Sequence, residues 1–291
     1  MVYIKNKNNF LFSDYFKISM TKEKQSKAHK HFLVTYPIST GQKLYSIFVT
    51  PMLAVILIVL AIKVFSLFPG APQPIIYASV VRAFFYTFFR LLVAYIFAII
   101  IAIPLALLAD SNPRAEKFLL PTFDIIESVP VLAFFPLIIA IFIKYGSFEM
   151  AAIFILFLAM LWNIVFSLIG GLKVVPSDIK SAAKIFGLKR LSYFWEMTMP
   201  SSVPYLITGS LLAWAQGWNL IIVAEVLHTY IPGGNSSSDL FGIGSMLVNS
   251  AASNEQSLFI IAIVTMIVGI GIINFFVWQK LLHYAERFKF E

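Results

Sequence analysis

Residues 91–109 read LLVAYIFAIIIAIPLALLA, an uninterrupted run without a charged side chain. A helix of about 20 apolar residues crosses the roughly 30 Å hydrocarbon core of a bilayer, and it satisfies its own backbone hydrogen bonds there. The run does not alternate between apolar and polar residues, which favours a helix over a strand of a membrane barrel. The stretch therefore predicts a transmembrane helix.

The rest of the chain repeats this pattern. Of its 291 residues, 59% are hydrophobic and 12% are charged, whereas about a quarter are charged in an ordinary soluble domain. Residues 1–42 form a polar, Lys-rich tail, and residues 43–291 form the predicted transmembrane domain. We predict an all-α integral membrane protein with six spans, at about 44–68, 80–109, 119–143, 150–171, 203–227 and 257–282.

The positive charges predict how these spans are oriented. Lys and Arg collect on the cytoplasmic side of membrane proteins, and 18 of the 22 fall on the side that holds both chain ends and the loop 172–202. We therefore predict a multi-pass protein of the cell membrane with both termini in the cytoplasm. The same topology accounts for the net charge of +8, so we predict no nucleic-acid partner. Membrane lipid is a predicted partner, and docking on it and disorder are both open interpretations of the Lys-rich tail.

Several kinds of chemistry are excluded by the residues that are missing. The chain has no cysteine, and its four histidines are scattered, so neither a disulfide nor a metal site is predicted. It also lacks a Gly-x-x-x-x-Gly-Lys-Ser/Thr loop, which is the sequence that cradles ATP phosphates. We therefore expect no cofactor bound by this chain and no catalytic residue in it.

The cytoplasmic loop 172–202 contains a short amphipathic pattern. Ile179, Ala182, Ala183 and Phe186 follow at i, i+3, i+4 and i+7, which places them on one face of a helix. Ser177 is the predicted N-cap, Asp178 lies in the first turn, and Gly187 is a natural stop. The sequence therefore predicts a helix over 178–187.

This loop also carries a motif. Ser181-Ala182-Ala183-Lys184-Ile185-Phe186-Gly187 is followed by nine residues and then by Met197-Thr198-Met199-Pro200. The pattern resembles the EAA signature of ABC-importer permeases, which reads Glu-Ala-Ala, three residues, Gly, nine residues, Ile-x-Leu-Pro. The Ala-Ala, Gly and Pro positions match, Ser181 replaces the usual Glu, and Met197 and Met199 replace Ile and Leu.

The wider chain looks similar to the branch of that family that takes up nitrate, sulfonates such as taurine, and related small organic anions. The similarity covers about residues 75–285. Its motifs are Thr87-x-x-Arg90, Ile103-Pro104-Leu105, Val129-Pro130-x-x-Ala133-x-x-Pro136-Leu137, Ala224-Glu225 after Trp214, and Gly242-Ile243-Gly244. Glu127 departs from the branch, which often has a basic residue at this position, and this weakens the inference of an anionic substrate.

The resemblance implies both a fold and a function. It implies the type I architecture of ABC-importer permeases, with six transmembrane helices, a cytoplasmic coupling helix, and alternating access for a small solute. It implies three partners: ATPase subunits that bind ATP and Mg, a second permease copy, more often identical than different, and an extracytoplasmic solute-binding protein. The residues implied to couple to the ATPase are Asp178, Ser181, Ala182, Ala183, Phe186, Gly187, Met197, Met199 and Pro200.

Charged and polar residues within the spans are the second group of candidates. A charge that faces lipid costs at least about 2.5–3.5 kcal/mol, so such residues usually turn inward. They either line the translocation path or its gate, or they pair with one another and stabilise a static bundle. The candidates for the path or gate are Arg90, Glu127, Gln216, Asn219 and Glu225, with Asp124 beside Glu127.

Two other functions compete with an importer permease. A secondary transporter driven by an ion gradient would use intramembrane acids as ion sites, but it predicts an inverted internal repeat that the two halves do not show. An intramembrane enzyme would need a catalytic cluster inside the spans, and the histidines lie outside the central ones. Only an importer permease explains the motif spacing over 181–200.

Overall fold

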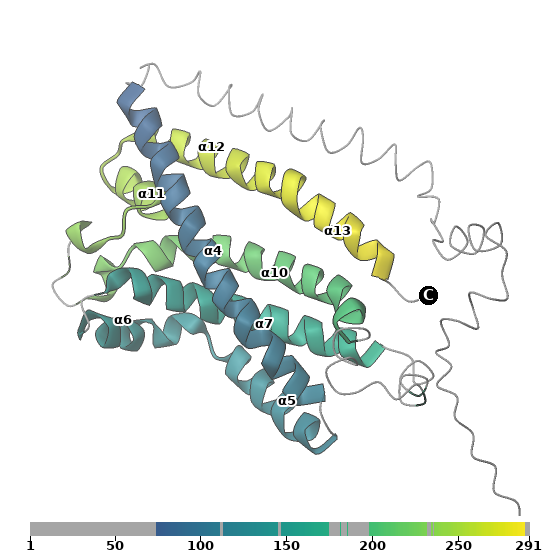
Figure 1. The fold of residues 1–291 in the computed structure, drawn as a ribbon. Coiled ribbons are helices and arrows are strands. Elements are labelled where there is room, and N and C mark those ends of the chain that lie inside the picture. The colour runs from purple at the N-terminus through teal and green to yellow at the C-terminus, as the bar shows by residue number, and fades with distance from the viewer. Residues whose placement is uncertain are drawn as a thin grey trace, which may run out of the picture. The chain divides into compact units, whose positions relative to one another are not determined.

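The structure is a computed structural model that describes residues 74–110, 113–144, 147–174, 181, 185, 198–231, 234 and 236–288. Every regular element in these residues is helical (Figure 1). The long helices are α4 (Pro74–Asp110), α7 (Phe148–Val174), α10 (Met199–Glu225) and α12 (Gln256–Ile273). The predicted helical membrane protein is confirmed, while the predicted span 44–68 and the tail 1–42 lie outside the described residues.

Helix α4 covers the second predicted span as one continuous helix of 37 residues. It begins at Pro74, whose fixed φ suits the first turn of a helix. It continues through Pro104 and ends at Asp110. Arg82 and Arg90 therefore both lie on this one long helix.

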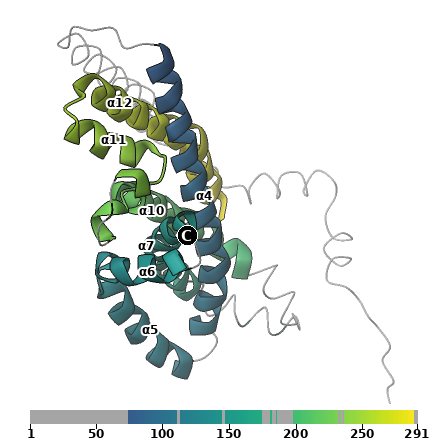
Figure 2. The ribbon, with the colours of Figure 1, turned by 90° about the vertical axis from the view of Figure 1, so that its left-hand side faces the viewer.

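The third predicted span, 119–143, is broken. It consists of α5 (Pro113–Ser128), the short 3-10 helix η1 (Val131–Phe134) and α6 (Phe135–Lys144). The axes of the two halves differ by 74°, and Figure 2 shows α5 and α6 pointing in different directions. The α conformation is disfavoured before a proline, and Pro130 itself is extended with ψ 122°, so the helix ends here. By length and composition the described residues hold four spanning helices, or five if this pair is one span.

The chain between α10 and the end is a series of shorter elements. The 3-10 turns η3 (His228–Tyr230) and η4 (Ser236–Ser238) lead to α11 (Ile243–Ala252), which is too short to cross a membrane. Helix α12 continues through a π-helical turn, η5 (Asn274–Trp278), into α13 (Gln279–Ala285) and η6 (Glu286–Phe288).

Helix α7 is at the centre of the packing, against α4 and α10 (Figure 1). Small residues allow this close approach. On α4 the buried alanines recur every four residues, at Ala94, Ala98, Ala102 and Ala106. On α10 the corresponding series is Gly209, Ala213 and Gly217. In the last turn of α7, Lys173 forms an exposed ion pair of 2.6 Å with Glu116 of α5.

Candidate functional site

Three motifs that are far apart in the sequence meet at one place. Thr87 and Arg90 come from α4, Glu225 is the last residue of α10, and Gly242-Ile243-Gly244 leads into α11. All three side chains, those of Thr87, Arg90 and Glu225, are buried. We call Thr87, Arg90, Glu149, Glu225 and the backbone of 243–245 the buried cluster.

Glu225 is the centre of the cluster, and its side chain is fully buried. One carboxylate oxygen, Oε1, accepts a hydrogen bond from the Thr87 hydroxyl at 2.6 Å and pairs with the Arg90 guanidinium. The other, Oε2, accepts from the backbone N–H groups of Gly244 at 2.7 Å and Ser245 at 3.3 Å. Both oxygens are thus satisfied by donors from two segments of the chain, α4 and the start of α11, as a buried carboxylate requires.

Arg90 is held by a second carboxylate as well. Its Nε and Nη2 atoms each donate to one oxygen of Glu149, both at 2.8 Å, in the bidentate geometry that suits a planar guanidinium. Glu149 lies in the first turn of α7, and its side chain is 52% exposed. One guanidinium and two carboxylates give the cluster a formal charge of −1, and the partly exposed Glu149 is the member in contact with the surroundings.

The glycines of the third motif are explained by this packing. A Cβ atom at Gly242 would meet the Glu225 carboxylate directly, and one at Gly244 would lie 2.9 Å from its Oε2. The backbone at Gly242 is extended, with φ −175°, so its conformation does not require glycine. The glycines are needed because α11 begins in contact with a buried carboxylate.

The remaining candidates for the path lie apart from this cluster. Gln216 and Asn219 on α10, and Asp124 and Glu127 on α5, are all exposed. In the part of the chain that the structure describes, no hydrogen bond or ion pair joins these four side chains to the buried cluster. Of the five predicted path residues, the structure therefore brings together Arg90 and Glu225 and leaves Glu127, Gln216 and Asn219 on surfaces.

The tryptophans of α10 belong to the core. Trp214 and Trp218 are buried. Trp214 lies edge-on to Tyr95 and Phe88, and Trp218 stacks on Phe84. They pack α10 against α4, next to the exposed face that carries Gln216 and Asn219.

The residues predicted to couple to the ATPase are described only in part. Ser181 is helical and exposed, as is Ile185 of the same motif. Met199 and Pro200 are the first two residues of α10. The other predicted coupling residues, Asp178, Ala182, Ala183, Phe186, Gly187 and Met197, lie outside the described residues.

Glu149 is the residue of the buried cluster that sequence reasoning missed. It immediately follows a short loop, where an acid is expected in the first turn of a helix because of the helix dipole. Because this role alone explains an acid at this position, the sequence does not indicate the pairing of Glu149 with Arg90, which lies 59 residues earlier. Neither the charge count nor the local pattern distinguishes Glu149 from other acids at helix starts, so its pairing with Arg90 appears only in the structure.

Known proteins support the same membrane architecture. The family described as the binding-protein-dependent transport system inner membrane component matches residues 94–283. The nitrate import permease protein NrtB of Leptolyngbya laminosa is 32% identical over 175 residues, which are 60% of this chain and 58% of that protein. The bicarbonate transport system permease protein CmpB of Synechocystis sp. is 28% identical over 174 residues, again 60% and 58% of the two chains.

A further relative is the taurine transport system permease protein TauC of Escherichia coli, which is 27% identical over 138 residues, or 47% of this chain and 49% of that protein. Each of these matches covers less than two thirds of the relative's length. The family match is longer and includes α7, α10 and α12 in full. Together with the apolar helices, it shows that this multi-pass membrane protein belongs to the family of binding-protein-dependent transport system inner membrane components.

Proposed function

We propose that this chain is the membrane-spanning permease subunit of an ATP-driven importer. The observation that carries the proposal is the family match over residues 94–283, which includes the loop with the EAA-like spacing between Ser181 and Pro200. The ATP and Mg belong to a separate ATPase subunit, and the helix over 178–187 seats in it. A solute-binding protein delivers the solute on the side opposite to both termini, which lie in the cytoplasm.

The broken third span supports a translocation path between two copies of this chain. Irregular backbone at membrane depth is tolerated only where protein covers it or where it lines a water-filled cavity. The break at Val129-Pro130 follows the exposed Asp124 and Glu127, for which the described residues provide no cationic partner. A second copy related by a two-fold axis places its own carboxylates at the same depth, and their repulsion favours a hydrated path there.

The substrate is proposed from the relatives, whose names specify nitrate, bicarbonate and taurine. We infer a small solute of this kind. Because the exposed side chains at the break are acidic, they do not attract an anion. Selection of an anion therefore belongs to the solute-binding protein, while this chain supplies the path with neutral donors such as Gln216 and Asn219.

Purification from the native host tests this proposal. We expect the tagged full chain in mild detergent to bring with it an ATPase that carries a P-loop, identified by mass spectrometry. Replacing Ala183 and Gly187 with Glu removes that ATPase, because charged side chains fill the close contact that small residues allow. Ala252→Glu, an exposed position at the end of α11, retains it as a matched control. A wild-type chain that emerges without an ATPase refutes the proposal and favours an ion-driven transporter.

A further inference from the structure

Helix α11 begins without a cap of its own. Its N-cap residue is Gly242, which has no side chain to accept hydrogen bonds. The first N–H groups of any helix have no partner within that helix. Ile243, Gly244 and Ser245 are all buried, so water does not provide the missing acceptors.

Two other helices supply these acceptors. The hydroxyl oxygen of Thr87, on α4, accepts from the N–H of Ile243 at 2.9 Å. The Oε2 atom of Glu225, at the end of α10, accepts from the next two N–H groups. A carboxylate at a helix N-terminus also interacts favourably with the helix dipole. The start of α11 is therefore capped by residues that lie 156 and 19 to 20 positions away.

The hydrogen bonds require a carboxylate specifically. Thr87, Arg90, Gly244 and Ser245 all act as donors to Glu225. A glutamine of nearly the same shape would have to direct its NH2 group, which is also a donor, at one or two of these donors. Arg90 supplies the positive charge that makes a buried carboxylate tolerable. The cluster thus depends on the chemistry of Glu225 and not only on its volume.

Beyond its first turn, α11 packs through apolar side chains. An apolar hollow of about 260 Å³ lies between Leu247 and Ala251 of α11, Ile222 of α10, and Phe259 and Met266 of α12. Apolar side chains do not fix one orientation by hydrogen bonding. The contacts at residues 243–245 are therefore the polar contacts that orient α11 relative to α4 and α10.

We propose that Glu225, together with Thr87 and Arg90, is a positioning residue that joins the start of α11 to the middle of α4 and to the end of α10, so that these three segments move as one unit. Its importance for transport rests on the proposed function, whereas its effect on α11 does not. In the predicted topology this unit lies on the extracytoplasmic side, opposite the predicted coupling loop.

Hydrogen–deuterium exchange of the purified full chain tests the local part of the proposal. We expect Glu225→Gln to speed exchange in peptides that cover residues 241–252 by about tenfold or more, because the bonds lost are bonds to a charged group. Thr87→Val, which keeps the shape and loses the hydroxyl, speeds exchange at the same helix start. Peptides from the middle of α7 keep the wild-type rate.

A matched variant separates capping from general damage. Thr208→Val removes a hydroxyl that, among the described residues, donates to the carbonyl oxygen of Pro204 in its own helix. It leaves the exchange of 241–252 unchanged. The proposal fails if Glu225→Gln and Thr87→Val leave this exchange at the wild-type rate, or if they raise it equally in α4, α7 and α10. If Glu225→Gln does not fold, the isosteric Thr87→Val decides.

Transport provides the second readout. In proteoliposomes that contain the co-purified ATPase and binding protein, we expect Glu225→Gln to lose ATP-driven uptake while ATP hydrolysis continues, since the coupling loop is untouched. Normal uptake by this variant overturns the role in transport. If the wild-type complex hydrolyses ATP but transports nothing, the proposed function fails, and the exchange result on α11 stands independently.

Discussion

Arg90 provides the first test at the scale of single residues. Replacing it with Met leaves Glu225 fully buried without its counter-charge, and breaking a buried pair in this way costs about 3–5 kcal/mol. We expect Arg90→Met to lower the stability of the purified chain by that amount, measured as its resistance to unfolding in SDS.

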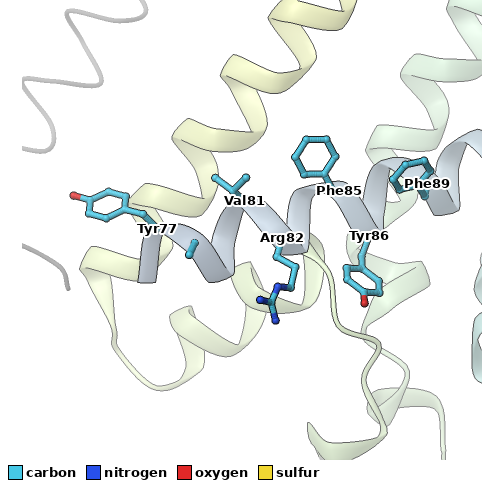
Figure 3. A pocket seen from close by; sticks show the side chains of 7 residues that line it. Tyr77, Val81, Arg82, Phe85, Tyr86 and Phe89 are labelled. Carbon is cyan, nitrogen blue, oxygen red and sulfur yellow. The ribbon is translucent and has the colours of Figure 1, made fainter. Parts of the chain in front are cut away.

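Arg82 is the matched control for this change. It lies two turns earlier on α4, on an exposed face with Tyr77, Val81, Phe85, Tyr86 and Phe89, and Figure 3 shows its side chain beside that of Tyr86. Because it is exposed, Arg82→Met should change stability by about 0.5 kcal/mol or less. Equal stability of the Arg90→Met and Arg82→Met chains would show that the buried pair contributes nothing.

Gly242 gives a second prediction at the same scale. An added methyl group meets the Glu225 carboxylate, so Gly242→Ala must displace either the carboxylate or the start of α11. We expect a loss of about 1–3 kcal/mol in the same unfolding measurement. Gly271→Ala is the control, because a Cβ there meets no atom within 4 Å and its helix gains about 1 kcal/mol of propensity. Matching losses in both variants would contradict the close contact.

Single residues also show how far the sequence could lead. Arg90 and Glu225 were identified as candidates because charges inside spans are costly, but their pairing was one of two open interpretations. The pairing depends on how α4 and α10 pack, and 135 residues separate the two partners. Local patterns contain no information on such a contact. Whether Arg90, Glu225 and the exposed Glu127 act in a path or gate stays a prediction.

At the scale of helices, the contact between α10 and α7 yields a third prediction. A Cβ at Gly209 would lie 2.6 Å from the Cβ of Ser167 and 2.9 Å from the carbonyl oxygen of Asn163, both on α7. A backbone oxygen cannot move aside as a flexible side chain does. We expect Gly209→Ala to separate the two helices slightly and to cost about 1–3 kcal/mol.

Gly170 is the control for that helix pair. It lies on α7, and an added Cβ would meet nothing within 4 Å. Gly170→Ala should therefore be neutral or slightly stabilising in the same SDS unfolding series. A Gly209→Ala chain as stable as Gly170→Ala would mean that α7 and α10 do not approach as closely as the structure places them.

Helices were easier to predict than their bends. Helix makes up most of each of the five predicted spans in the described part of the chain, because long apolar runs have few alternatives. The 74° break was not predicted, and the reason is visible in the other prolines. Pro104, Pro121 and Pro204 all lie inside continuous helices. Proline weakens a helix, but the surrounding packing decides whether the chain turns there. The presence of Pro130 alone therefore does not predict the break.

For the whole molecule, small residues allow the helices to pack closely, and polar contacts join the helices near the two ends of α7. The buried cluster joins α4, α7, α10 and α11 at one end, and the exposed pair of Glu116 and Lys173 joins α5 and α7 at the other. A buried network contributes more to rigidity than an exposed ion pair, which is worth at most about 1 kcal/mol. Among the described residues, the end of α7 that carries Lys173 is therefore held less firmly by polar contacts than the end that carries Glu149.

The fourth prediction asks whether the broken pair α5 and α6 crosses the membrane. If it does, Lys117, near the start of α5, and Lys144, the last residue of α6, lie on opposite sides; a re-entrant pair returns them to the same side. The chain contains no cysteine, so each single-cysteine variant carries one reactive thiol. We expect Lys144→Cys, but not Lys117→Cys, to react with a membrane-impermeant maleimide in intact cells.

Two further single-cysteine variants, Asn254→Cys and Ala102→Cys, complete this experiment. Asn254→Cys, in the exposed turn between α11 and α12, should react from the same side as Lys144→Cys, since two further spans, α7 and α10, separate the two positions. Ala102→Cys, whose position is fully buried, should stay unlabelled until the chain is denatured. In inverted vesicles the pattern reverses, and Lys117→Cys alone of the three exposed variants reacts. Labelling of Lys117→Cys and Lys144→Cys from one side would show that the pair is re-entrant. Every later helix would then have the orientation opposite to the predicted one, and α11 and its cap would lie on the cytoplasmic side.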